Sequence, residues 1–424
     1  MNEDQPASTE LRSHWTVLFA AAVGVGLSIA AIPPVVISVF ARPMTGELGW
    51  SLQAYQTGGL FVALGVLVAS PLSGILVDRF EPRRIALIGI VVFSAGLCSL
   101  AFVSERVATY YAAMLCLTLA AVGVLPVVWT RIVNGVFQRQ RGLALGLMLS
   151  GSGLTGIVLP RYAQALIDLL GWRVAWLGMA ALPLLVALPI CFWLLRPAGS
   201  GTAVGGGAGS GRSSAPGITL GRAVRGWRFW ALFWSFTVVS VCLAGWNANL
   251  VPILTDRSFS APQAAALVGI LGASQACGRI VVGLLVDRLW APGVAAFAFL
   301  LPAAGVQFVL ADNVTSVTAG IAIATFGLAH GAEFDFLAYQ IARYFGLRHY
   351  GRIYGLLVVP ISMATALGAI ALGRVRDQTG SFDAALTWLP LLLFAAAALQ
   401  LSLGRYPSSA AMARPATALS AEGG

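Results

Sequence analysis

Three pairs of landmarks in this chain recur at one fixed offset of 209 residues. They are Asp78-Arg79 and Asp287-Arg288 (287−78 = 209), Gly142 and Gly351 (351−142 = 209), and Gly171 and Gly380 (380−171 = 209). Soluble repeat arrays have much shorter periods of about 20–50 residues, whereas many secondary transporters contain repeated helical units. The repeat therefore predicts two copies of one membrane-embedded unit, and it favours a solute carrier.

The composition agrees with a membrane protein, because 58% of the residues are hydrophobic, only 10% are charged and the mean hydropathy is +0.85. Such a chain of 424 residues has too little polar surface to cover a soluble globule. Its net charge of +10 comes from arginines scattered between apolar runs, so we expect no nucleic acid partner. The chain contains no lysine, which excludes a lysine Schiff base.

Metal and catalytic chemistry find no support in the sequence. The five cysteines lie within apolar segments without metal-ligand spacing, which is typical of small packing residues: Cys98, Cys116, Cys191, Cys242 and Cys277. The chain also has no G-x-S-x-G, H-E-x-x-H or phosphate-binding glycine loop. We therefore expect no catalytic residue, no metal and no cofactor. The alternative class, a membrane-embedded enzyme or signalling protein, is disfavoured.

Twelve segments are long and apolar enough to cross a bilayer, which takes about 20 residues as a helix. They are residues 15–40, 55–77, 84–103, 108–135, 142–168, 174–195, 228–254, 262–286, 293–311, 314–342, 351–373 and 384–404. Pro33-Pro34 is expected to kink the first segment. The predicted fold is an all-α membrane protein with twelve transmembrane helices in two pseudo-symmetric six-helix bundles.

The two bundles are predicted at residues 15–195 and 228–405. Short tails precede and follow them, at residues 1–14 and 406–424. The join at residues 196–227 is rich in glycine and serine, and this composition predicts a flexible tether with no core of its own.

Arginines are unequally divided between the two sets of connections. The richer set contains Arg79, Arg83, Arg84, Arg139, Arg141, Arg196, Arg212, Arg222, Arg225, Arg228, Arg288, Arg348 and Arg352. By the positive-inside rule, this set and both termini face the cytoplasm. The acidic start of the chain argues for a retained first helix over a cleaved signal peptide. We expect a monomer in the plasma membrane, which for a bacterial protein is the inner membrane.

One motif resembles a known family. GILVDRFEPRR, residues 74–84, and its partial copy GLLVDRLW, residues 283–290, are similar to the loop G-x-x-x-D-R-x-G-R-R of the major facilitator superfamily, although Glu81-Pro82 replaces the motif's glycine. The resemblance implies that an aspartate at a helix end pairs with arginines and a neighbouring helix terminus to gate the cytoplasmic side. The implied gating residues are Asp78, Arg79, Arg83, Arg84, Asp287 and Arg288. The alternative is a plain positively charged loop.

A narrower resemblance concerns residues 137–173, which are similar to a stretch of the monocarboxylate porters and oxalate–formate exchangers. SQACGRIVVGLLVD, residues 274–287, also resembles the porters' eighth span, in which an arginine contacts the substrate carboxylate. Arg279 stands at the place of that arginine, and Gln275 stands where the porters have an aspartate. The resemblance thus implies a carboxylate ligand at Arg279 and a proton-coupling site elsewhere.

The depth of Arg279 supports this reading. It precedes Asp287 by eight residues, so it lies about 12 Å inside the boundary. An arginine there costs at least about 2.5–3.5 kcal/mol, so it should face a cavity and a partner. Its planar fork suits a carboxylate. The alternative is a structural arginine capped by helix carbonyls.

The tenth predicted segment carries an unusual set of polar residues. His330 and Glu333 are three residues apart and share a helix face, while Asp335 lies on another face together with Tyr339 and Arg343. Two carboxylates and an imidazole are costly in lipid, so His330, Glu333 and Asp335 are the predicted proton-coupling site. The predicted substrate ligands are Arg279, Gln275, Asn247, Asn249 and Tyr339; both asparagines precede Pro252, where an unwound segment would expose their amides.

The sequence as a whole predicts a secondary active transporter that moves a small organic anion, specifically a monocarboxylate, by proton-coupled alternating access. Its predicted partners are that anion, protons and the lipid bilayer. The alternative is a proton-driven exporter of amphipathic or aromatic compounds, which would tolerate loss of Arg279. The sequence leaves open the identity of the substrate and the choice between import and export.

Overall fold

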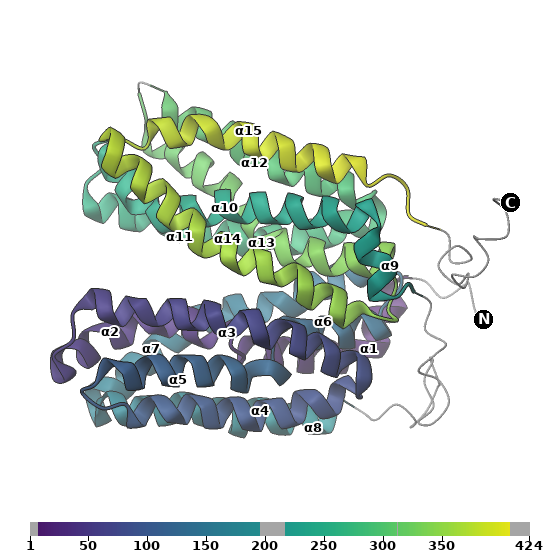
Figure 1. Cartoon of the computed structure of the whole chain (residues 1–424), viewed down its shortest axis with the longest axis horizontal. Helices are drawn as coiled ribbons and strands as arrows, with labels where there is room; N and C mark the ends of the chain where they lie inside the picture. Colours follow the sequence, from purple (N-terminus) through teal and green to yellow (C-terminus); the bar gives the residue numbers. More distant parts are fainter. Residues whose placement is uncertain (1–6, 196–216, 312, 408–424) are drawn as a thin grey trace, which may run out of the picture.

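The computed structural model describes residues 7–195, 217–311 and 313–407, and these residues are almost entirely helical. Figure 1 shows two bundles that lie side by side with their helices running in roughly the same direction. The predicted tails at 1–14 and 406–424 and the predicted tether at 196–227 lie partly outside the described residues, at 1–6, 408–424 and 196–216.

The first bundle contains α1 (Ala7–Gly26), α2 (Ile32–Leu48), α3 (Leu52–Arg79), α4 (Pro82–Ser99), α5 (Val107–Ala120), α6 (Pro126–Val136), α7 (Arg141–Leu182) and α8 (Leu188–Leu194). The second bundle contains α9 (Leu220–Arg225), α10 (Trp227–Asp256), α11 (Ala261–Arg288), α12 (Ala291–Leu310), α13 (Ser316–Tyr344), α14 (Tyr350–Thr379) and α15 (Asp383–Ser402).

Within the described residues, ten helical stretches are long and apolar enough to cross a membrane. One of them, Arg141–Leu194, has 54 residues and contains Gly171 with φ 82° and ψ 164°, a conformation that ends one passage and begins the next. Counting this stretch as two passages, and α1 with α2 as one more, gives the twelve passages that the sequence predicts (10 + 1 + 1 = 12).

The first passage is interrupted just before its prolines. α1 ends at Gly26 and α2 begins at Ile32, so Pro33 and Pro34 occupy the first turn of α2. A proline there loses no helical hydrogen bond, because the first N–H groups of a helix have no partner within it. The predicted kink at Pro33-Pro34 is therefore a break over residues 27–31.

The offset of 209 residues also relates backbone conformations. Gly171 and Gly380 both have a positive φ, 82° and 78°, although their ψ angles differ, 164° and −5°. Gly49, with φ 68°, has its counterpart in Ser258, with φ 67° (258−49 = 209), and Ser258 is the one non-glycine residue with positive φ in the described part of the chain. The repeated unit thus imposes the same turn on a side chain that disfavours it.

The bundles meet through two matching helix pairs, α3 with α14 and α7 with α11. Glycines allow the backbones to touch: a Cβ at Gly74 would lie 2.1 Å from the oxygen of Gly351, and one at Gly283 would lie 2.7 Å from the oxygen of Gly142. The repeat relates these contacts, since 283−74 = 209 and 351−142 = 209. Small residues at such crossings are typical of membrane helices.

The end of the predicted tether is ordered. In residues 217–227, the N–H of Ile218 donates to the oxygen of Phe345 (2.9 Å), and α9 follows with Ala223 buried. The N–H of Leu220 donates to Nδ1 of His349 (3.3 Å). Burial, together with Arg352 and Arg348, lowers the pKa of His349 and so favours the neutral, accepting imidazole. This stretch contains the larger apolar side chains Ile218, Leu220 and Val224.

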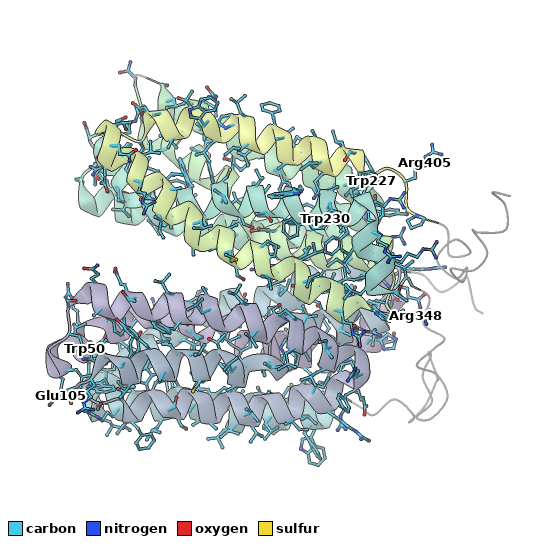
Figure 2. The ribbon with its side chains drawn as sticks, in the orientation of Figure 1. Trp50, Glu105, Trp227, Trp230, Arg348 and Arg405 are labelled. Atoms are coloured by element: carbon cyan, nitrogen blue, oxygen red, sulfur yellow. The ribbon has the colours of Figure 1, made fainter. Side chains whose placement is uncertain are left out.

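The two ends of the molecule differ in how the bundles are joined. Figure 2 marks one end by Trp227, Trp230, Arg348 and Arg405, and we call it the closed end because the bundles touch there; Trp50 and Glu105 mark the far end. The ion pairs at the far end each join helices of the same bundle: Glu47 with Arg173, Asp256 with Arg376, and Arg257 with Asp383.

Candidate functional site

Two carboxylates are buried inside the second bundle, both on α13. The exposed fractions of Glu333 and Asp335 are only 2% and 3%. The hydroxyl of Ser240, on α10, donates a hydrogen bond to Oε1 of Glu333. Nδ1 of His330 lies 3.9 Å from Oε2 of the same carboxylate. The structure therefore brings His330 and Glu333 together, and Ser240 is a partner that sequence reasoning missed.

Asp335 lies on another face of α13 in a different environment. Among the described residues, neither of its carboxylate oxygens has a hydrogen-bond partner. The positive charge of Arg279, on α11, acts on both Asp335 and His330. The charges of Arg279 and Asp335 also act on the buried hydroxyl of Tyr354, on α14, which has no hydrogen-bond partner in the described part of the chain. An unpaired buried carboxylate is costly, so this group calls for either a proton or the charge of Arg279.

Arg279 stands where the two bundles meet. A Cβ at Gly146, on α7 of the first bundle, would lie 2.4 Å from the backbone oxygen of Arg279. The side chain of Arg279 is half-buried. Arg279 thus lies between the buried acids of the second bundle and the surface where the two bundles meet.

The other predicted substrate ligands are spread along the second bundle. The backbone of Gln275 packs against Gly331 on α13, one turn from Arg279. Oδ1 of Asn247 is buried and has no hydrogen-bond partner among the residues that the structure describes, whereas Nδ2 of Asn249 donates to the oxygens of Gly245 (2.9 Å) and Ala369 (3.2 Å). α10 is a continuous helix from Trp227 to Asp256, so the expected unwinding at Pro252 does not occur.

Tyr339 lies away from this cluster, in a cavity at the closed end that Asp287 and Arg343 also line. Its distance along α13 explains this placement, because four residues of helix separate it from Asp335 by about 6 Å toward the end of the helix. The structure therefore does not bring Tyr339 together with Asn247 and Asn249.

Two aspartates join the bundles at the closed end. Asp78, at the end of α3, accepts hydrogen bonds from the N–H groups of Gly351 (2.9 Å) and Arg352 (3.0 Å) in the first turn of α14. Asp287, at the end of α11, accepts from Gly142 (2.7 Å) and Leu143 (2.9 Å) in the first turn of α7. A carboxylate at a helix N-terminus is favoured both by these unpaired N–H groups and by the helix dipole. We call these two contacts the latches.

The predicted gating arginines do not join the latches. Arg83 donates to the oxygen of Phe192 (2.9 Å), and Arg84 pairs with Glu81 (3.1 Å), both within the first bundle. Arg79 is exposed, and Arg288 lines the closed-end cavity beside Asp287.

The cations near Asp78 come from elsewhere. Nε of Arg352 is 4.0 Å from its carboxylate, and Arg131 acts on it through its charge. Another contact joins the bundles: Nδ2 of Asn134, on α6, donates to the hydroxyl of Tyr350, on α14 (3.1 Å). The sequence signal that could have revealed the two latches is the repeat, because Asp78 and Gly142 recur as Asp287 and Gly351 at the same offset.

In the part of the chain that the structure describes, no group of three or more histidine, cysteine or acidic side chains is placed to hold a metal ion. All five cysteines are free. Chemically, the arginine between the bundles can bind an anion, and the buried acids can take up a proton.

The chain is similar to known transport proteins in sequence and in fold. Residues 14–369 match the family model described as Major Facilitator Superfamily. The chain is 28% identical to monocarboxylate transporter 11 of Mus musculus over 336 residues, covering 74% of this chain and 71% of that protein. It is 26% identical to a gallate transporter of Pseudomonas putida over 384 residues, covering 78% of this chain and 82% of that protein.

Among solved structures, the chain is similar to a bacterial homologue of the iron transporter ferroportin in an outward-facing state. The TM-score is 0.70 at 14% sequence identity, and the match covers 92% of this chain and 98% of that one. At this identity the likeness concerns the fold alone, and it agrees with the twelve passages counted above.

Proposed function

Because this chain belongs to the Major Facilitator Superfamily and is a membrane transport protein, we propose that it carries a small monocarboxylate together with a proton by alternating access. Two relatives, a monocarboxylate transporter and a gallate transporter, support a carboxylate as the substrate. The structural support comes from the residues around Arg279.

One observation carries the proposal: Asp335 is buried, has no hydrogen-bond partner in the described part of the chain, and has Arg279 as the cation that acts on it. A buried carboxylate without hydrogen bonds is stable only when a proton or a nearby cation neutralises it. Glu333 differs, because Ser240 and His330 lie against it. Asp335 is therefore the proposed proton carrier, and Glu333 is the proposed orienting residue for His330.

Arg279 couples proton and substrate because two carboxylates compete for it. In the empty carrier, ionised Asp335 neutralises Arg279. Protonation of Asp335 removes that negative charge, and the guanidinium is then free to bind the carboxylate of the substrate bidentately. The buried charge is the same in both cases, one cation and one anion, so both forms can change conformation without stranding a charge. Binding of the substrate alone would leave two anions against one cation.

The latches supply the conformational part of the proposal. Both hold the closed end together, so the conformation described above is the one in which a substrate would reach Arg279 from the far end. By the positive-inside rule, the closed end faces the cytoplasm and both termini lie on that side. Release of Asp78 and Asp287 from the helix termini would let the bundles part there and close at the far end.

The proposal is tested by uptake into proteoliposomes of labelled monocarboxylates, from acetate to an aromatic acid, with and without an imposed pH gradient. We expect accumulation of at least one acid that follows the gradient, and no uptake of its neutral amide. Arg279→Lys should weaken uptake because it loses the planar fork, and Arg279→Ala should nearly abolish it. Arg225→Ala is the matched control, since Arg225 is an exposed residue of α9.

Normal carboxylate binding by Arg279→Ala would contradict the role of Arg279. The alternative function, export of amphipathic or aromatic compounds, predicts that Arg279→Ala still moves such compounds against a pH gradient. The same vesicles distinguish the two functions when an uncharged aromatic compound is loaded inside them.

A further inference from the structure

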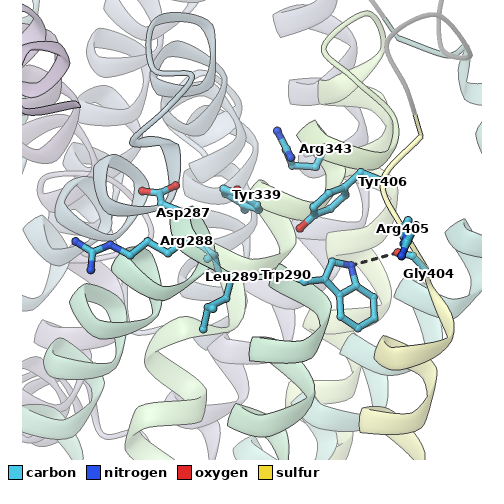
Figure 3. Close-up of a pocket in the computed structure, with 10 residues that line it drawn as sticks. Asp287, Arg288, Leu289, Trp290, Tyr339, Arg343, Gly404, Arg405 and Tyr406 are labelled. Carbon is cyan, nitrogen blue, oxygen red and sulfur yellow. Dashed lines mark hydrogen bonds between the residues drawn. The ribbon is translucent and has the colours of Figure 1, made fainter. Parts of the chain in front are cut away.

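A cavity of about 610 Å³ opens at the closed end of the second bundle (Figure 3). Three parts of the chain form its walls: the end of α11 with the connection to α12, the last turns of α13, and the segment that follows α15. The lining residues are Val286, Asp287, Arg288, Leu289, Trp290, Tyr339, Arg343, Gly404, Arg405 and Tyr406. The proposed transport mechanism uses none of them except Asp287.

The walls of this cavity are held by specific contacts. Nε1 of Trp290 donates to the oxygen of Gly404 (3.2 Å), as drawn in Figure 3. The hydroxyl of Tyr406 accepts from the N–H of Ala291 (3.0 Å), and Nε of Arg228 donates to the oxygen of Leu403 (3.2 Å). The segment after α15 is therefore fixed against α10 and α12, and the cavity is a built feature of the bundle.

The cavity is strongly positive. Three arginines line it, Arg288, Arg343 and Arg405, and in the described ranges no acidic side chain forms an ion pair with any of them. The remaining charge in the wall is Asp287, whose carboxylate is occupied by the latch to α7. The guanidinium of Arg343 lies over the ring of Tyr406, 4.4 Å from its centroid. Such stacking orients the guanidinium, and its five N–H donors exceed what a side-chain hydrogen bond with Tyr406 uses.

The mouth of the cavity lies beside surface that is apolar and exposed. Leu289 and Trp290 are 57% and 36% exposed, and Leu285, one turn earlier on α11, is also exposed. In a membrane protein such a surface contacts lipid, and tryptophan is enriched at the level of the headgroups. The cavity therefore combines unpaired cations with an adjoining lipid-facing strip.

We propose that this cavity binds the phosphate group of an anionic phospholipid, with the acyl chains along Leu285 and Leu289. Arginine forks match phosphate oxygens bidentately, and three of them compensate the charge of a phosphate diester and a second anionic group. Basic pockets between transmembrane helices on the cytoplasmic side are suited to anionic headgroups. A soluble phosphate ester offers the same phosphate chemistry without the chains, and the experiment distinguishes these two sources.

The test is native mass spectrometry of the purified full chain, titrated with phosphatidylglycerol, phosphatidylcholine or glycerol 3-phosphate. The pocket variant is Arg288→Gln/Arg343→Gln/Arg405→Gln. The control variant, Arg12→Gln/Arg225→Gln/Arg348→Gln, removes the same charge from exposed arginines outside the cavity. We expect wild type to bind phosphatidylglycerol at least tenfold more tightly than phosphatidylcholine, the pocket variant to lose this preference, and the control variant to keep it.

A variant with lysine at the three pocket positions covers the case in which the glutamine variant fails to fold. It keeps the charge but loses the fork, so its preference for phosphatidylglycerol should lie between those of wild type and the glutamine variant. Equal loss of preference in the pocket and control variants would overturn the proposal, because the binding would then reflect overall charge. So would an unchanged preference in the pocket variant.

Competition with glycerol 3-phosphate shows whether the cavity takes its phosphate group from a lipid or from a soluble ester. Glycerol 3-phosphate should compete only weakly with the lipid; competition at equal concentration would refute the lipid and assign the cavity to soluble phosphate esters. The measurement needs no transport, so its outcome does not depend on the proposed substrate.

Discussion

Neutralising Asp78 should open the closed end of the transporter. The side chain of Asp78 is only 5% exposed, and it accepts two hydrogen bonds from the first turn of α14. Asparagine keeps one acceptor oxygen but presents an NH₂ group to the second N–H, so at least one charge-assisted hydrogen bond is lost. Such a bond contributes about 1.5–3 kcal/mol.

This loss predicts the size of the population shift. At about 1.4 kcal/mol per factor of ten, Asp78→Asn should shift the ratio of closed to open conformations by about 10- to 150-fold. Asp287 makes the equivalent pair of bonds to α7, and both latches break in the same transition. The two losses should therefore add, so the double variant Asp78→Asn/Asp287→Asn should shift the ratio by about 3–6 kcal/mol.

The assay is the labelling rate of Ser70→Cys, in nanodiscs and in a background without the five native cysteines. Ser70 is 2% exposed and its hydroxyl donates to the oxygen of Gly355 across the bundles (3.2 Å), so a thiol there reacts only when the closed end parts. Asp168→Asn is the matched control, because Asp168 lies on the far half of α7 and its contact is with Gln164 of the same helix. Unchanged labelling in both the single and the double latch variants, at full labelling after denaturation, would refute the latch.

Three further changes test neighbouring parts of the account. Gly146→Ala should part the bundles, because its Cβ would lie 2.4 Å from the oxygen of Arg279. The control is Gly153→Ala on the same helix, whose Cβ would meet nothing within 4 Å. Labelling of Ser70→Cys should be faster in the Gly146 variant and unchanged in the control. Ser240→Ala should impair pH-driven uptake several-fold without loss of exchange, because Glu333 loses its hydroxyl partner; identical gradient dependence to wild type would contradict this. Tyr354→Phe should weaken substrate binding less than Arg279→Ala, as measured by thermal stabilisation with the acid; an equal loss in both would mean that Tyr354 is itself a ligand.

The fold was predictable from the sequence because it depends on periodic features. The offset of 209 residues and twelve apolar segments suffice for two six-helix bundles. The loop motif implied that Asp78 meets a neighbouring helix terminus, but it did not say that this terminus is the start of α14 at Gly351. Local structure at the end of the tether was not predictable from composition. The glycine-rich composition of the tether did not reveal that Ile218 and Ala223 dock onto the second bundle.

The candidate site was predictable only in part. Helical spacing correctly separates Glu333 from Asp335, because residues two apart on a helix point to different faces. It does not say that Ser240 meets Glu333 or that Asp335 is left without a hydrogen-bond partner in the described part of the chain. Nor does the loop motif show that Arg83 turns to Phe192 while Arg131 and Arg352 stand near Asp78. These pairings depend on neighbouring helices, which the spacing within one helix does not specify.

The most direct measurement compares Asp335→Asn with Glu333→Gln in proteoliposomes under two conditions. One condition is uptake driven by a pH gradient, and the other is exchange of labelled for unlabelled acid without a gradient. Because asparagine cannot release a proton and cannot neutralise Arg279, Asp335→Asn should lose uphill accumulation and keep exchange, and Glu333→Gln should retain part of its accumulation. Normal uphill accumulation by Asp335→Asn would contradict the claim that Asp335 carries the proton.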